Sequence, residues 1–189
     1  MFKLKAAFFS LITLSFVVLP HAASGAPKEV TLKITEAESH YELSVPVSRL
    51  VMTIPKNGLS QKRISGGATD SLRYFFFEDK TRGLVASGWF ESSSAYSNFN
   101  KYWNGEKKSW QSGSLPAPIN EKFLKSVGWE AVAYDISFPK GENSHIRAHW
   151  VQAGTWIDLH LSLTSETKNS GSREKLLEIL KGIQIKQRH

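Results

Sequence analysis

Cysteine is absent from this chain of 189 residues, and its absence excludes several kinds of protein and chemistry. The chain can form no disulfide, no residue can act as a thiolate nucleophile, and no N-terminal cysteine can carry a lipid anchor. An exported eukaryotic domain more often carries disulfides, so a cysteine-free exported chain favours a bacterial origin. Side-chain packing must then hold the fold together.

Long apolar runs are also scarce, and the one present lies at the N-terminus. Lys3 and Lys5 precede an apolar run over residues 6–19, and small residues follow at 22–25. A basic start, a short apolar core and a small-residue exit are typical of a secretory signal peptide. The run is shorter than the ~20 residues that a membrane-spanning helix needs.

We therefore predict a signal peptide over residues 1–25 and a single globular α+β domain over residues 26–189, periplasmic or secreted, with no stable membrane span after cleavage. The net charge is +7, and removal of the two lysines of the signal peptide leaves +5. This modest basic excess favours contact with an anionic envelope surface. No nucleic-acid-binding motif is present, so nucleic acid is not an expected partner.

Motifs of known catalytic mechanisms are missing as well. The chain has no GxSxG nucleophile elbow, no GxxxxGK[ST] phosphate loop and no HExxH zinc motif. The serine-rich residues 91–97 are expected to cap a helix and not to supply a nucleophile. We therefore predict no catalytic residue and no cofactor, and we favour a binding role over an enzymatic one.

Periodicity predicts a mixed fold, because apolar–polar alternation indicates strands and a repeat of three to four residues indicates helices. The expected strands are residues 29–35, 41–47, 49–55, 72–79, 83–92 and 129–138, the expected helices are residues 94–110 and 172–183, and the expected loops are residues 57–71 and 112–120. Ser172 is the expected N-cap of the second helix. The predicted fold class is α+β, a twisted antiparallel β-sheet flanked by helices.

The first helix carries an aromatic stripe. Tyr96, Phe99, Trp103 and Trp110 fall within one narrow arc at 100° per residue. An earlier end at residues 104–105 stays an alternative, because glycine commonly terminates helices.

Residues 144–163 are expected to form a β-hairpin with Ala153 and Gly154 as its turn. One register places three apolar pairs on one face: Trp150 with Ile157, Ala148 with Leu159, and Ile146 with Leu161. The other face then carries His149 with Asp158, Arg147 with His160, His145 with Ser162, and Trp156 with Val151. A slip by one residue would mix the two faces, which supports this register.

The polar face of this hairpin supplies the candidate binding residues: His145, Arg147, His149, Trp156, Asp158 and His160. One alternative is a metal site made of His149, Asp158 and His160, although the fixed charge of Arg147 opposes a cation there. Another alternative is an ordinary polar face, open to solvent or covered by a helix. For Trp156 the two hypotheses are an exposed binding residue and a ring packed under a helix.

The order of the elements resembles a known fold. The hairpin with its Ser-capped helix at 172–183, and the helix that follows the strand at 83–92, are similar to the PsbP-like fold shared with the Mog-type Ran-binding proteins. The resemblance covers residues 40–186 and implies an antiparallel sheet between helices, an α/β/α sandwich. It also implies a role in binding or assembly, and it assigns no functional residue.

The leading interpretation is an exported, non-enzymatic binding or accessory protein whose partner is an unknown protein or envelope component. One alternative is a metal-binding protein or metal-dependent enzyme that uses His149, Asp158 and His160. Another is a basic adaptor on the envelope surface.

Overall fold

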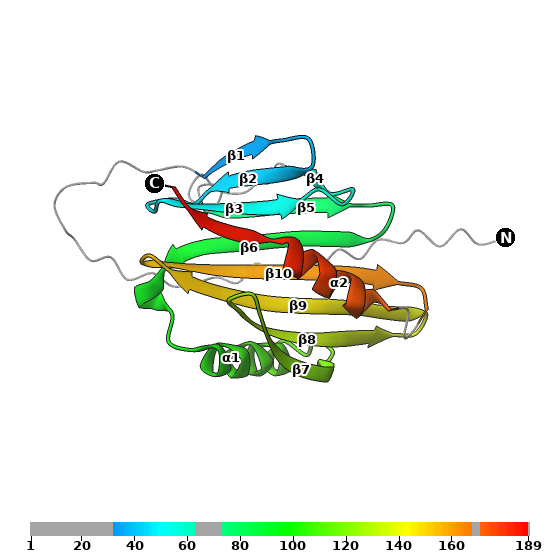
Figure 1. Cartoon of the computed structure of the whole chain (residues 1–189). Coiled ribbons are helices and arrows are strands. Elements are labelled where there is room, and N and C mark those ends of the chain that lie inside the picture. Colours follow the sequence, from blue (N-terminus) through cyan, green and yellow to red (C-terminus); the bar gives the residue numbers. More distant parts are fainter. Residues whose placement is uncertain (1–31, 63–72, 168–170, 189) are drawn as a thin grey trace.

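The computed structural model describes residues 32–62, 73–167 and 171–188 (Figure 1). The predicted signal peptide, the first part of the strand expected at 29–35 and most of the loop expected at 57–71 lie outside these residues. In chain order the strands are β1 (Lys33–Glu36), β2 (His40–Ser44), β3 (Leu50–Pro55), β4 (Ser60–Gln61), β5 (Tyr74–Asp79), β6 (Leu84–Ser92), β7 (Ile119–Ser126), β8 (Trp129–Phe138), β9 (Gly141–Gln152), β10 (Thr155–Ser165) and β11 (Gln184–Gln187). The helices are the short 3-10 helix η2 (Ser93–Ala95) and the α-helices α1 (Phe99–Ser112) and α2 (Ser172–Gly182).

The strands form two antiparallel sheets. The smaller sheet has the order β1-β2-β3-β11, and the larger has the order β4-β5-β6-β10-β9-β8-β7. Mostly antiparallel sheets accompanied by two α-helices confirm the predicted α+β class.

The two α-helices lie on opposite faces of the larger sheet. Leu176 and Leu180 of α2 belong to the main core, which also contains Ala133 of β8 and residues of the smaller sheet. Trp103 of α1 packs instead against Val132, the neighbour of Ala133 in the same strand. Because successive strand residues point to opposite faces, these contacts separate the two layers.

A buried carboxylate holds the start of α2. Asp135 of β8 is only 5% exposed, and it pairs with Arg173 in the first turn of the helix. It also accepts hydrogen bonds from Ser144 Oγ at 2.9 Å and from Asn120 Nδ2 at 3.0 Å. The charge of Asp135 is thus compensated inside the protein.

The hairpin over β9 and β10 has the predicted register. Trp150 pairs with Ile157 and His149 with Asp158. Ala153 and Gly154 form the turn, with φ of 49° and 75°. Both values lie in the left-handed region that a two-residue type I′ turn requires.

The first α-helix begins later than predicted. Asn98 caps α1 by accepting a hydrogen bond from the Lys101 amide, whereas Ser92 caps η2. The predicted helix start at residue 94 and the predicted capping of this helix by the serine-rich stretch are therefore wrong. The helix continues past Gly105 to Ser112, so the alternative end at residues 104–105 is wrong as well.

The predicted N-cap of α2 is also wrong. Gly171, with a left-handed φ of 71°, holds the N-cap position, and Ser172 is the first helical residue. Glycine adopts this conformation at low cost, so the chain can turn sharply into the helix.

Strand β7 is the main element that the sequence did not predict. It begins inside the loop expected at 112–120 and pairs with β8 along one edge of the larger sheet. The register shifts between Ile119 and Lys122, and Asn120 there has a φ of 56°. This β-bulge interrupts the alternation that identifies strands in a sequence.

Within the described ranges, no helix is both long and apolar enough to cross a lipid bilayer.

Candidate functional site

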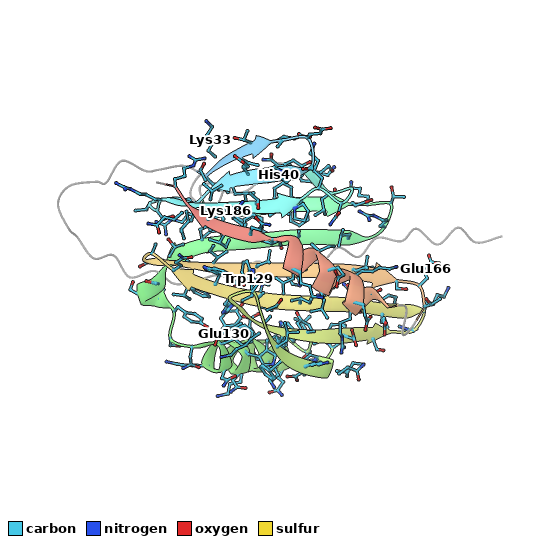
Figure 2. All side chains as sticks on the ribbon, viewed as in Figure 1. Lys33, His40, Trp129, Glu130, Glu166 and Lys186 are labelled. Atoms are coloured by element: carbon cyan, nitrogen blue, oxygen red, sulfur yellow. The ribbon has the colours of Figure 1, made fainter. Side chains whose placement is uncertain are left out.

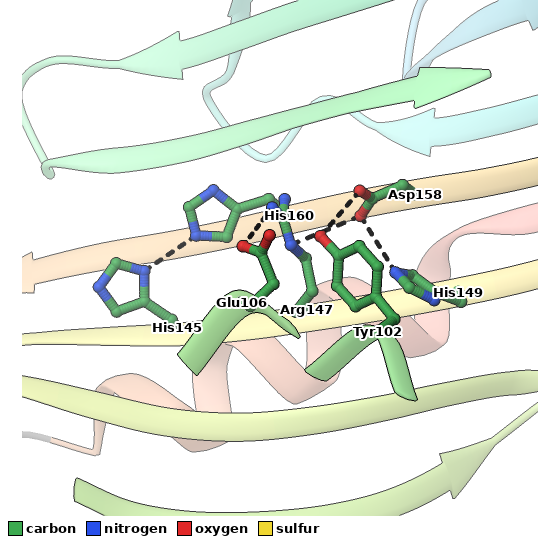
Figure 3. A network of polar contacts seen from close by, with 7 residues as sticks. All are labelled: Tyr102, Glu106, His145, Arg147, His149, Asp158 and His160. Atoms are coloured by element: carbon green, nitrogen blue, oxygen red, sulfur yellow. Dashed lines mark hydrogen bonds and ion pairs between the residues drawn. The ribbon is translucent and has the colours of Figure 1, made fainter. Parts of the chain in front are cut away.

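The polar face of the β9–β10 hairpin lies beneath α1, and side chains of the helix reach down to it (Figure 3). Tyr102 Oη donates a hydrogen bond to Asp158 Oδ2 at 3.1 Å. Glu106, one helical turn later, accepts from Arg147 Nη2 at 3.4 Å. Of the two structural hypotheses for this face, the structure therefore has the helix-covered one.

Arg147 and Asp158 are the centre of this network. Arg147 Nε lies 3.5 Å from Asp158 Oδ1, and the guanidinium lies 5.7 Å from the centroid of the Tyr102 ring. The side chains are 23% and 16% exposed, so both charges are largely removed from water. A partly buried pair of this kind needs each charge to be matched, and Glu106 supplies the second carboxylate for Arg147.

The titration of these groups reflects their mutual compensation. Burial acts to raise the pKa of Asp158, but the charge of Arg147 and contacts with His149 and Tyr102 outweigh it and hold that pKa below its ordinary value. Burial acts to lower the pKa of Arg147, but the charge of Asp158 and its other neighbours raise it overall. Burial raises the pKa of Tyr102 far above its ordinary value. Near neutral pH the network therefore contains a guanidinium, a carboxylate and a neutral phenol.

His149 lies in a box of four aromatic rings and is 1% exposed. The rings belong to Tyr96, Phe99, Tyr102 and Trp156, at centroid distances of 5.4, 4.9, 4.2 and 5.2 Å and with near-perpendicular planes. Neither nitrogen of His149 makes a hydrogen bond, although Nε2 lies 3.4 Å from Asp158 Oδ1. An edge-to-face contact between two rings is weakly favourable, and His149 makes four contacts of this geometry.

His145 and His160 form a second part of the site. Nδ1 of His145 and Nε2 of His160 are 2.9 Å apart, so one nitrogen donates and the other accepts. Their rings are stacked, with an interplanar angle of 5°, and Tyr134 stacks on His145 at 4.8 Å. Burial, followed by the nearby charge of Arg147, lowers the pKa of His145 to about 4 and that of His160 well below its ordinary value. The accepting nitrogen in this hydrogen bond must keep its lone pair, so at least one of the two imidazole rings is neutral.

The proposed metal ligands do not converge. His149 contacts Asp158, whereas Nε2 of His160 is bonded to His145. Across the part of the chain that the structure describes, no three His, Asp or Glu side chains are placed to hold one metal ion. Zinc requires three or four ligands around one point, and the hairpin separates these residues into two groups.

Trp156 is half-buried and packs against aromatic rings. Its ring lies 5.3 Å from that of Tyr96 and 5.9 Å from that of Tyr102. Its indole N–H is buried without a hydrogen-bond partner. The structure thus brings Trp156 together with His149, Arg147 and Asp158, but as the layer under α1.

Sequence reasoning missed the residues by which α1 joins this network. Tyr102 lies just outside the aromatic stripe and Glu106 follows it by four residues, so both face the hairpin. This i, i+4 spacing was the available signal. It could not identify Asp158 and Arg147 as partners, because the contact joins residues 56 and 41 positions apart.

A groove of about 650 Å³ opens beside this network, between the start of α1 and the β7–β8 hairpin. Phe99 and Phe123 line it and meet edge-on at 6.3 Å, and Lys125 and Glu130 also border it. Four of the six exposed large hydrophobic residues in the described ranges lie between residues 115 and 127: Leu115, Ile119, Phe123 and Val127. Of these four, Phe123 lines the groove and is 52% exposed, and an exposed aromatic ring at a groove is typical of interaction sites.

The charges around this groove are paired within the protein. Glu130, labelled in Figure 2, pairs with Lys125 at 3.4 Å, and both residues line the groove. Glu121 of β7 accepts from Trp103 Nε1 at 2.7 Å and from Lys107 Nζ at 3.1 Å. One basic and one acidic side chain therefore border the groove, and they compensate each other.

Comparison with known proteins adds little to these observations. No protein-family model matches the chain, and no curated protein matches it. A crystal structure from Bacteroides thetaiotaomicron VPI-5482 superposes with a TM-score of 0.43 and 9% sequence identity. The superposition covers 75% of this chain and 46% of the other, so the chain spans about half the length of that protein. A likeness at this level carries no argument about function.

Proposed function

We propose that this protein is an exported, non-enzymatic binding or accessory protein of the bacterial periplasm or exterior, with a PsbP-like arrangement of its sheet and helices. The groove between α1 and the β7–β8 hairpin, with the half-exposed ring of Phe123 on its wall, carries this proposal. The polar residues of the β9–β10 hairpin have an indirect role, because they hold α1 in position beside the groove. The basic excess of the whole chain favours an acidic envelope protein as the partner.

Cross-linking in the cell envelope tests this proposal. A photoreactive residue at position 123 is expected to form an adduct with a partner protein, whereas one at the equally apolar, 78% exposed Val47 is not. Phe123→Ser is expected to weaken capture of that partner at least ~10-fold, and Val47→Ser to leave it unchanged, because anchors at the centre of an interface supply most of its energy. Equal adducts at both positions would show that the groove is not the binding surface.

Export is tested separately by the mass of the protein recovered from the periplasm or medium. We expect the mature chain to begin near Gly25 or Ala26, because small residues precede the cut that a signal peptidase makes. Recovery of the intact N-terminus in the cytoplasmic fraction would contradict this prediction. A mass that includes Lys3 and Lys5 in the membrane fraction would instead indicate an uncleaved anchor.

A further inference from the structure

The outer side of β7 is the long edge of the larger sheet in the described part of the chain. The strand spans Ile119–Ser126, whereas β4 at the opposite edge spans only Ser60–Gln61. An edge strand presents a row of N–H and C=O groups that can pair with another strand. The exposed ring of Phe123 lies near the middle of this edge.

Three residues of β7, one in the bulge and two beyond it, have a self-complementary pattern. Phe123 is opposite Val132 and Lys125 is opposite Glu130 in β8, which places both on the α1 face of the sheet. Glu121 lies on the same face, because it contacts Trp103 of α1. On this face an acid, an aromatic ring and a base therefore follow one another at every second residue.

We propose that the edge of β7 pairs antiparallel with the same edge of a second copy of this chain, with the two-fold axis at Phe123. Phe123 then lies opposite Phe123 of the second copy, and Glu121 lies opposite Lys125 of the second copy on both sides of the axis. Cross-strand aromatic pairs and opposite charges both stabilise an antiparallel pair. A register centred on Lys122 would instead place two lysines opposite each other.

The length of the pairing is limited. The bulge at Asn120 ends it on one side, and the turn at Val127 and Gly128, both with positive φ, ends it on the other. An interface of this length lies below the ~1,200 Å² that stable complexes bury. The dimer is therefore expected to dissociate with a Kd in the range of about 1–100 μM.

Disulfide trapping tests the register directly, because the chain contains no cysteine of its own. Phe123→Cys places the one thiol on the axis, where facing Cα atoms lie ~4.5–5.5 Å apart, within the ~4.4–6.8 Å that a disulfide spans. Lys125→Cys is the matched control on the same face and strand. In the proposed register its thiols are four residues apart along the strands, roughly 13 Å, and cannot be bridged.

The expected result is that mild oxidation of the mature chain links Phe123→Cys at least ~10-fold faster than Lys125→Cys. Equal rates would overturn the proposed register. So would a wild-type chain that sediments as a monomer at several hundred μM, well above the expected Kd.

A charge reversal gives an independent measurement. Lys125→Glu alone and Glu121→Lys alone each place like charges opposite one another and are expected to weaken the dimer at least ~10-fold. An equimolar mixture of the two variants restores both opposite-charge pairs and is expected to dimerise again. Circular dichroism checks each variant first, because Glu121 also accepts from Trp103. Failure of the mixture to dimerise, with both variants folded, would overturn the proposal.

This dimer goes beyond the proposed function and succeeds or fails separately from it. A wild-type chain that sediments as a monomer but still captures its partner would reject the dimer and leave the binding role intact. Loss of partner capture with an intact dimer would reject the binding role alone.

Discussion

Replacing Arg147 with methionine is expected to lower the free energy of unfolding by about 3–5 kcal/mol. Arg147 contacts Asp158 at 3.5 Å and Glu106 at 3.4 Å, in a place where both carboxylates are largely removed from water. Without the guanidinium the two carboxylates stay buried and uncompensated, and breaking a buried pair on one side costs far more than the pair itself contributes. Urea denaturation of the mature chain at neutral pH measures the change.

Lys108→Met is the control, because it removes a cation from the exposed side of α1, the helix that the network contacts. We expect this change to stay within about 0.5 kcal/mol, as is usual for surface positions. In the double variant Arg147→Met/Asp158→Asn the loss should be smaller than the sum of the two single losses, because each change removes the other's unpaired charge. A loss for Arg147→Met no larger than that for Lys108→Met would show that the network does not hold α1 to the sheet.

Mild acid is expected to destabilise the fold through the stacked histidines. The ordinary histidine pKa is 6.5, and burial with the charge of Arg147 lowers that of His145 to about 4. The unfolded chain therefore binds more protons than the folded one between these values. The stabilisation is fully present above about pH 6.5 and is lost as the pH falls towards about 4, by up to roughly 3 kcal/mol for His145.

The groups around the two histidines set this direction. Arg147 of β9 lowers the pKa of both rings, whereas Asp135 of β8 acts to raise that of His145 and Asp158 of β10 that of His160. A second loss of stability follows at lower pH. The pKa of Asp158 is lower in the folded than in the unfolded chain, so protonation of this carboxylate destabilises the fold as the pH falls below about 3.8. The histidine step begins at a higher pH than the Asp158 step, and the two can therefore be distinguished.

Unfolding by urea at pH 7.5, 5.5 and 4.5 measures the first step. The double variant His145→Gln/His160→Gln should show a much flatter dependence on pH over this interval, because neither replacement titrates there. Tyr134→Phe keeps the ring that stacks on His145 and should keep the pH dependence of the wild type. An equally steep loss of stability in the His145→Gln/His160→Gln variant would assign acid sensitivity to other groups.

Much of the architecture was predictable from local patterns. Strand β8 has the predicted bounds, because apolar residues at every second position, from Val132 to Phe138, mark one face of the strand. Strand β7 was missed, because its bulge and its exposed side chains on both faces remove the apolar–polar alternation that identifies a half-buried strand. The start of α1 was misplaced because several neighbouring serines and Asn98 are all competent caps, and the surrounding chain decides which one is used.

The sequence by itself determined the register of the β9–β10 hairpin and which residues share its faces. Both follow from short-range facts: a strand alternates with a period of two, and Ala153-Gly154 accepts the positive φ of a tight turn. Only the tertiary structure decided which element covers that polar face. Tyr102 and Glu106 of α1 cover it, although they lie 56 and 41 residues before their partners in the chain. No local periodicity in a sequence predicts which face of a sheet a helix will cover. A buried charge must find its partner in space and not in sequence. Four of the six candidate residues, Arg147, His149, Trp156 and Asp158, therefore contact α1. An exposed aromatic ring lies instead on β7, at Phe123.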